Sequence, residues 1–554
     1  MGNVYGHNFE KMALGYNTLM PFSQNYDPLN SFWLSVAAAL LPVVVLLAAL
    51  GLARLKAHVA ALLSLTSAVL AGIFIWGIPP AMGLLSVVYG AAYGFLPIGW
   101  IIVNVIFMYN LANRKGLFQT LQDSLTAITR DRRLQLLLVA FCFGAFFEGA
   151  AGFGTPVAVT SSILIGLGFN PLAAAGLTLI ANTAPVPYAG LGTPLVALQA
   201  VTGLDLKALT VSVAQQMAIF DLLIPIWIIV AFAGWRGLLG IWPAVLLAGG
   251  SYAVTQYLVA ALHGPWLVNI VAALVSMGVL VLFLLKWQPR KTWTFPGESE
   301  ASPAARPQHS RAEIVRAWMP WLVLSVVVFI WGLPEVKAFL DSFSLVRIPV
   351  SGLHLLVQRM PPVVPAAQPQ SAIFDLSWLS ASGTGILAAT LLAGALLGYT
   401  PRELLAVYGA TWKQVWRSLV TISAMMAIGF ITRYAGMDGT LGLAFAQTGP
   451  LYPFFGTLLG WMGVVLTGSD TSSNVLFGSL QRITSEQLGF NPVTMAAANS
   501  SGGVMGKMIN AQSIVVASTA TGRYGKEGEI LRYVFFHSLA LVALAGILVM
   551  VLAR

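Results

Sequence analysis

Two acidic residues stand in segments that a membrane would be expected to bury. Glu148 is the only charged residue in the stretch 134–204, and Asp470 lies in a polar segment that begins at Thr467. A charged side chain in a bilayer costs on the order of 3 kcal/mol by insertion scales, so acids at such positions usually have a function. We interpret Glu148 and Asp470 as candidate proton-coupling residues. A structural acid that accepts hydrogen bonds from broken backbone is the alternative for Glu148.

Glycine, proline and polar residues surround both acids. Three glycines and Pro156 follow Glu148, which favours a helix break, and hydroxyl and amide side chains surround Asp470. Such groups, together with freed backbone N–H groups, can bind a carboxylate and a hydroxyl or coordinate Na⁺. A cluster of caps and interhelix hydrogen bonds is the alternative. The candidate substrate-binding residues in these motifs are Gly149, Gly154, Asn182, Thr183, Thr193, Ser469, Thr471, Ser472 and Asn474.

Lys507 is a lone cation between uncharged runs. It follows the glycine-rich segment 502–506, which we interpret as a flexible turn. Its partner is either the carboxylate of a substrate or one of the two acids, and both interpretations stay open. The segment is not a nucleotide-binding P-loop, because Ser501 and Met508 stand where that motif needs glycine and Ser or Thr.

The composition predicts no cofactor and no metal site. Cys142 is the only cysteine, which excludes a disulfide framework and cysteine-rich metal sites. We expect Cys142 to be a small core residue. His537, in the last apolar run, is expected to be a hydrogen-bonded packing residue rather than a proton relay.

The elements that must position these residues are membrane helices. The chain is 58% hydrophobic and 9% charged, whereas about a quarter of residues in soluble domains carry charge. The uncharged run 32–53 and the run 59–78 each reach the roughly 20 residues that cross a bilayer. The sequence therefore predicts an all-α polytopic protein of about 12–14 transmembrane segments.

The formal charge of +10 follows the expected topology rather than nucleic-acid binding. Five basic residues lie in the segment 114–133 and six in the segment 286–316, and alternate loops carry few. The positive-inside rule places the basic loops in the cytoplasm. We expect a bacterial inner-membrane protein with a periplasmic segment 1–31, a first membrane half 32–286, a cytoplasmic linker 287–316 and a second membrane half 317–554 that includes a periplasmic loop 334–380.

The two halves share a pentapeptide. The letters Leu-Gly-Phe-Asn-Pro begin at Leu167, nineteen residues after Glu148, and again at Leu488, eighteen residues after Asp470. This match in spelling and spacing favours an internal duplication. Because the first half starts outside and the second starts inside, the repeats are expected to be inverted, with re-entrant helical hairpins around a midplane site. Such an architecture is typical of secondary transporters that work by alternating access.

Other classes fit the sequence less well. A membrane enzyme would need a nucleophile elbow, a His-rich metal motif or paired loop carboxylates, and the sequence shows none. A channel is disfavoured because duplicated hairpins imply a closed central site. A Na⁺-coupled carboxylate carrier remains an alternative to a proton symporter.

Over nearly its whole length the chain resembles the bacterial lactate permease family. The resemblance is carried by four motifs, which lie at 141–156, 182–185, 468–474 and 502–514. It implies transport of lactate and glycolate with protons, and it adds Gln512 and Ser513 to the candidate substrate-binding residues. Thr155, Thr193 and the pair at 510–511 depart from the residues expected there. Similar proteins begin near Met20, and the oligomeric state stays open, a homo-oligomer included.

Overall fold

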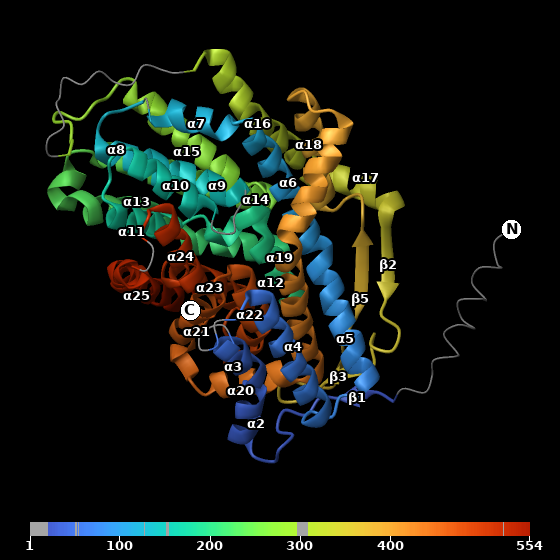
Figure 1. The fold of residues 1–554 in the computed structure, drawn as a ribbon. Coiled ribbons are helices and arrows are strands. Elements are labelled where there is room, and N and C mark those ends of the chain that lie inside the picture. The colour runs from blue at the N-terminus through green and yellow to red at the C-terminus, as the bar shows by residue number, and fades with distance from the viewer. Residues whose placement is uncertain are drawn as a thin grey trace.

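The computed structural model describes residues 20–49, 53, 55–126, 128–150, 155–295, 309–523 and 526–553. Within these residues the chain forms a bundle of α-helices (Figure 1). Nine of the described helices are long and apolar enough to span a membrane, and five shorter apolar helices accompany them. The prediction of an all-α polytopic membrane protein is confirmed.

The helices up to residue 239 form a first set. They are α2 (Phe32–Ala39), α3 (Leu41–Leu47), α4 (Ala57–Phe74), α5 (Pro80–Tyr93), α6 (Trp100–Arg114), α7 (Leu117–Thr126), α8 (Arg132–Leu136), α9 (Gly144–Ala150), α10 (Thr155–Gly166), α11 (Pro171–Ala181), α12 (Ala189–Thr202) and α13 (Leu206–Leu239). π-helical segments join α5 to α6 and α8 to α9, and the first of these two spans is kinked at Leu96, whose φ and ψ of −130° and 120° are not helical.

Two helices follow the first set. The remaining helices, after residue 309, form a second set. The two are α14 (Trp242–His263) and α15 (Val268–Leu284). The second set consists of α16 (Arg311–Gly332), α17 (Pro334–Ser344), α18 (Ser382–Leu396), α19 (Pro401–Ala435), α20 (Met437–Ala446), α21 (Tyr452–Thr467), α22 (Asp470–Leu488), α23 (Pro492–Gly506), α24 (Ala511–Ala520) and α25 (Glu527–Leu552).

The two sets pack against each other reciprocally. α4 contacts α19 while α18 contacts α6, α7 contacts α16 while α20 contacts α2, and α10 contacts α24 while α12 contacts α22. The joined α5–α6 span and α19 both contain 35 residues, and α7 and α20 both contain 10. In Figure 1, α7 and α16 lie at one end of the molecule and α20 and α2 at the other. Reciprocal contacts of this kind are those expected of two structural repeats related by a pseudo-two-fold axis.

The repeated pentapeptide forms the same turn in both sets. Gly168, just after α10, and Gly489, just after α22, take left-handed φ angles of 87° and 72°. Asn170 and Asn491 then cap α11 and α23, each accepting a first-turn N–H at 2.9 Å. Glycine tolerates the left-handed angle, asparagine satisfies a free N–H group, and proline suits the first helical position. The turns create two helical hairpins, α10–α11 and α22–α23.

The predicted loop 334–380 contains structure that the sequence analysis did not anticipate. After α17, strand β2 (Leu345–Pro349) pairs antiparallel with β5 (Ile373–Ser377). Strand β3 (Val357–Arg359) lies between β1 (Phe22–Ser23) and β4 (Gln368–Pro369). These strands are short and form mostly through pairing between distant segments, which local sequence patterns signal weakly. The β1–β3 pair fastens the chain before α2 onto this loop.

Candidate functional site

A cavity of about 90 Å³ lies between the first and the second set of helices, here called the first and the second repeat. One water molecule needs roughly 10–15 Å³ of such space, so the cavity has room for a small solute of a few heavy atoms. The first repeat contributes Glu148, Val186, Ala189, Gly190, Thr193 and Pro194 to its lining. The second repeat contributes Gly468, Ser469, Asp470, Thr471, Lys507, Gln512, Ser513 and Val516. Both candidate acids and Lys507 therefore face the same space.

Interrupted helices surround the cavity. The break between α21 and α22 falls at Gly468, whose φ is 76°, and the break between α23 and α24 falls at residues 507–510. In the first repeat, residues 182–188 separate α11 from α12, and left-handed angles follow at Gly190, Leu191 and Gly192. A left-handed leucine is strained, and such strain concentrates at functional sites. The backbone around the cavity is thus broken on both sides.

Two helices of the second repeat begin at the cavity. Ser469 caps α22 by accepting the N–H of Ser472 at 3.2 Å. Asn510 caps α24 by accepting the N–H groups of Gln512 and Ser513 at 2.8 and 3.2 Å. A helix start carries a partial positive charge and favours an anion. The cavity therefore offers positive potential to a carboxylate from two directions.

Asp470 is held by hydrogen bonds within its own repeat. Ser500 Oγ donates to Asp470 Oδ2 at 2.5 Å, and Asn474 Nδ2 donates to the same oxygen at 3.4 Å. Asn474 also donates to the carbonyl of Pro194 at 3.2 Å, which connects α22 with α12 of the other repeat. Asp470 Oδ1 has no hydrogen-bond partner among the described residues. One carboxylate oxygen is fixed, and the other stays available.

Glu148 differs because neither of its oxygens has a hydrogen-bond partner among the described residues. Its side chain is fully buried near the end of α9. Asn182 and Lys507 are the neighbouring groups that act on its carboxyl group. An ionised carboxylate is costly to bury without donors. Glu148 is therefore a buried acid that lacks the direct hydrogen bonds that hold Asp470.

Lys507 is the cation that the two acids share. It is 8% exposed, and its Nζ donates to the carbonyl of Gly468 at 3.2 Å. Its charge acts on both Glu148 and Asp470. Two buried acids thus face one buried cation. This shortage of positive charge is the central electrostatic feature of the site.

The glycine-rich segment before Lys507 was predicted to be a flexible turn, and that prediction is wrong. Gly502, Gly503 and Gly506 belong to α23. A Cβ atom at Gly506 would lie 2.5 Å from the carbonyl oxygen of Trp461 in α21, and one at Gly503 would lie 2.7 Å from Asp470 Oδ1. The glycines therefore let α23 approach α21 and the acid closely, at a cost in helix propensity.

The other predicted site residues fall into three groups. Thr193, Ser469, Thr471, Gln512 and Ser513 line the cavity. Outside the lining, Asn182, Thr183, Ser472 and Asn474 are buried polar residues. Gly149 packs against α15, where an added Cβ would lie 2.7 Å from the Cβ of Asn269. Gly154 lies outside the described residues.

Ser500 is a site residue that the sequence analysis did not single out. It donates the short hydrogen bond to Asp470 from the neighbouring helix, thirty residues along the chain. The available signal was the run of three polar residues, Asn499, Ser500 and Ser501, within the uncharged segment that forms α23. That run indicates buried polar contacts but does not identify their partner.

A larger cavity of about 710 Å³ lies beside α12 but holds neither acid. Its described lining is mainly aromatic and apolar, with Lys337 and Asp375 as its charged groups. It therefore lacks the concentration of polar groups found in the smaller cavity. The smaller cavity is the candidate site because of its chemistry rather than its size.

Comparisons with known proteins agree with this architecture. A family model described as L-lactate permease matches residues 35–554. The chain belongs to the L-lactate permease family. The L-lactate permease of Salmonella typhimurium is 44% identical, over 95% of this chain and 97% of that relative.

Further relatives are named as glycolate and L-lactate permeases. The glycolate permease GlcA of Escherichia coli is 41% identical over 97% of this chain and 98% of its own length. The L-lactate permease of Bacillus subtilis is 40% identical over 96% and 98%. Among solved structures, the YdaH transporter of Alcanivorax borkumensis matches 85% of this chain and 88% of that one, with 14% identity and a TM-score of 0.45. The chain is thus a multi-pass membrane protein whose relatives are permeases.

The structure also bears out two smaller predictions. His537 accepts a hydrogen bond from Trp227 Nε1 at 2.9 Å and therefore packs as a hydrogen-bonded residue. Cys142 is fully buried, with its Sγ 3.5 Å from Ser276 Oγ. Neither residue lines the candidate cavity.

Proposed function

We propose that the protein imports lactate, glycolate and related small 2-hydroxy monocarboxylates across the bacterial inner membrane together with protons. Its relatives are named for lactate and glycolate. The observation that carries the proposal is the cavity between the repeats, where Glu148, Asp470 and Lys507 meet. A small polar cavity of this size suits a three-carbon acid better than a large metabolite.

Charge balance explains why import needs a co-transported cation. When ionised, Glu148 and Asp470 carry two negative charges against one positive charge on Lys507. A monovalent substrate anion adds a third negative charge inside a low-dielectric site, where repulsion is strong. A proton on one acid restores the balance. Glu148 is the acid proposed to exchange that proton, since neither of its oxygens lies within hydrogen-bond geometry of a described donor, whereas Asp470 accepts two hydrogen bonds.

The other residues have separate proposed roles. Lys507 and the N-termini of α22 and α24 attract the substrate carboxylate. The hydroxyl and amide side chains proposed to recognise the 2-hydroxyl group are those of Ser469, Thr471, Gln512 and Ser513, which line the cavity. Asn182, Ser472 and Asn474, predicted from the sequence for the same role, lie outside the lining. Asp470 keeps the second repeat in place and retains a negative charge that pairs with Lys507.

Alternating access follows from two repeats that share one site. In the proposed topology the basic loops face the cytoplasm, segment 1–31 faces the periplasm, and the repeats are inverted. The helices α10 and α11 contain 12 and 11 residues, fewer than the roughly 20 needed to span a bilayer. Short hairpins that meet at the site can move relative to the longer helices and expose it to each side in turn.

The direct test is uptake of labelled lactate into proteoliposomes. One proton with one monovalent anion is electroneutral, so we expect an inwardly directed proton gradient to drive accumulation without Na⁺. An imposed membrane potential should leave the uptake unchanged. Uptake that ignores the pH gradient and requires Na⁺ would refute the proton mechanism.

A Na⁺-coupled carboxylate carrier is the second candidate. The hydroxyl-rich start of α22 and the unpartnered Oδ1 of Asp470 favour it, because both are oxygen ligands suited to Na⁺. Replacing Na⁺ by choline at a constant pH gradient separates the two candidates. The Na⁺-coupled carrier loses uptake in choline, whereas the proton symporter retains it.

A further inference from the structure

A second polar cavity, of about 870 Å³, opens far from the candidate site. It lies where the end of α13, the start of α14 and the segment after α15 meet. Four basic residues, Arg133, Arg236, Arg290 and Lys291, belong to its lining, and no Asp or Glu occurs among the described residues that line it. The transport mechanism proposed above makes no use of this cavity.

The floor of the cavity is held by a buried ion pair. Arg133 and Asp131 are 4% and 1% exposed, and Arg133 Nη2 lies 2.6 Å from Asp131 Oδ2. Asp131 also accepts the N–H of Trp293 at 3.0 Å, and Arg133 donates to the carbonyl of Gly237 at 2.9 Å. These contacts fasten the segment after α15 to the start of α8, and α8 to the end of α13. The cavity is therefore preorganised.

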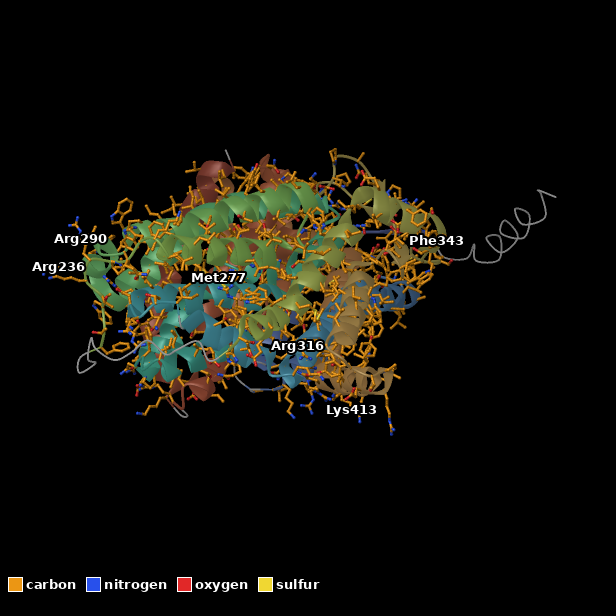
Figure 2. All side chains as sticks on the ribbon, turned by 90° about the horizontal axis from the view of Figure 1, so that it is seen from above. Arg236, Met277, Arg290, Arg316, Phe343 and Lys413 are labelled. Atoms are coloured by element: carbon orange, nitrogen blue, oxygen red, sulfur yellow. The ribbon has the colours of Figure 1, made fainter. Side chains whose placement is uncertain are left out.

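Its three other cations remain available. Arg236, Arg290 and Lys291 are exposed, and none of them forms an ion pair with a described residue. Figure 2 shows Arg236 and Arg290 at the same edge of the molecule, with their side chains extending outward. Three cations that form no ion pair with a described residue create a positive potential around the cavity. Such a potential attracts an anion that carries its charge on several oxygens, as a phosphate does.

Apolar side chains border the cations. Leu239 and Trp242 line the cavity and are 67% and 53% exposed, and Leu285, which is 74% exposed, caps the end of α15 just before the segment that enters the lining. Trp287 and Trp293 are half-buried in the cavity wall. Tryptophan is enriched where a protein crosses the boundary between headgroups and acyl chains. A ligand that contacts both the cations and the exposed leucines needs a negatively charged headgroup and a hydrocarbon tail. A free inorganic anion has no such tail.

We propose that this cavity binds the headgroup of an anionic phospholipid, with its phosphate at Arg236, Arg290 and Lys291 and its acyl chains along Leu239 and Leu285. Basic pockets at the ends of membrane helices recognise lipid phosphates by this combination of charge and apolar contact. The lipid would bridge α13, α14 and the segment that leads into the linker.

Native mass spectrometry of the full-length protein tests this proposal. The detergent-purified protein is titrated with phosphatidylglycerol, cardiolipin or zwitterionic phosphatidylethanolamine. We expect the anionic lipids to bind and phosphatidylethanolamine to bind much more weakly. In the variant R236Q/R290Q/K291Q, affinity for the anionic lipids should fall at least about tenfold, since each cation near a headgroup contributes about fivefold.

A matched variant removes the same charge elsewhere. Arg402→Gln, Lys413→Gln and Arg417→Gln change three exposed basic residues of α19, and Lys413 lies well away from Arg290 in Figure 2. This control should keep the parental affinity. Equal losses in the two triple variants, equal binding of phosphatidylethanolamine, or displacement of the lipid by glycerol 3-phosphate would each overturn the proposal. The single variant Arg290→Gln, in a segment without regular structure, should lose about fivefold and provides the same test with little risk to folding.

Discussion

The two acids of the central cavity come from different helix ends, Glu148 from the end of α9 and Asp470 from the first position of α22, and they have different surroundings. Asp470 accepts hydrogen bonds from Ser500 and Asn474, whereas Glu148 has no hydrogen-bond partner among the described residues. Donors stabilise an ionised carboxylate, and their absence favours the neutral acid. In the proposed mechanism this difference assigns the exchanged proton to Glu148 and the pairing with Lys507 to Asp470.

Lys507 is the group on which both acids depend, so its replacement should have the largest effect. In Lys507→Gln, the two acids lose their shared counter-charge and the substrate loses its cation. Breaking a buried charge pair costs about 2–5 kcal/mol, which corresponds to a rise in KM of roughly 30-fold or more. The KM is measured from initial rates of lactate counterflow over a range of lactate concentrations. A variant with parental KM would show that Lys507 does not bind substrate.

Asp470→Asn sharpens the comparison between the acids. The amide keeps an oxygen that accepts from Ser500 but removes the charge that pairs with Lys507. Loss of a charge-assisted hydrogen bond costs about 1.5–3 kcal/mol, so we expect KM to rise about tenfold or more. Uptake driven by a pH gradient should persist at high substrate concentration. Complete loss of pH-driven uptake with intact counterflow would instead assign the coupled proton to Asp470.

Gly503→Ala tests how closely α23 must approach Asp470. A Cβ there would lie 2.7 Å from Asp470 Oδ1, so the carboxylate must shift. Overpacking of this kind costs about 1–3 kcal/mol, and we expect a lower melting temperature together with weaker lactate binding. Gly409→Ala in α19 is the matched control, because nothing lies within 4 Å of its added Cβ. Equal behaviour of the two variants would contradict the close-approach argument.

Ser500→Ala should have the smallest effect and makes the surroundings of Asp470 resemble those of Glu148. It removes the 2.5 Å hydrogen bond to Asp470 Oδ2. A net hydrogen bond contributes about 1 kcal/mol, so KM should rise about fivefold. The optimum pH for uptake should also change, because two acids would then lack a strong donor. An unchanged pH profile would show that Ser500 does not set the charge of Asp470.

Much of the site could be predicted because its signals are local in the sequence. Glu148, Asp470 and Lys507 stand out as charges in apolar runs, and the repeated pentapeptide, which predicted an internal duplication, forms similar turns at Gly168 and Gly489. These features depend on residue type and spacing alone. The structure brings the three charged residues to one cavity, as expected for residues near a shared midplane site.

Other features depend on contacts between distant segments and could not be predicted. The glycines of α23 suggested a flexible turn, but their role follows from the carbonyls of α21 that they approach. Strand β3 pairs through Val357 and Gln358 with residues 22–23, more than 300 positions away. The donor to Asp470 is likewise a serine whose position is defined only by the packing of α22 against α23.

Glu148→Gln, reconstituted in proteoliposomes, tests the central claim most directly. Glutamine keeps the size of the side chain but cannot exchange a proton. The account predicts that counterflow of labelled lactate continues, while accumulation driven by a pH gradient is lost. Accumulation at the parental level under a pH gradient would contradict the account, because Glu148 would then not carry the coupled proton.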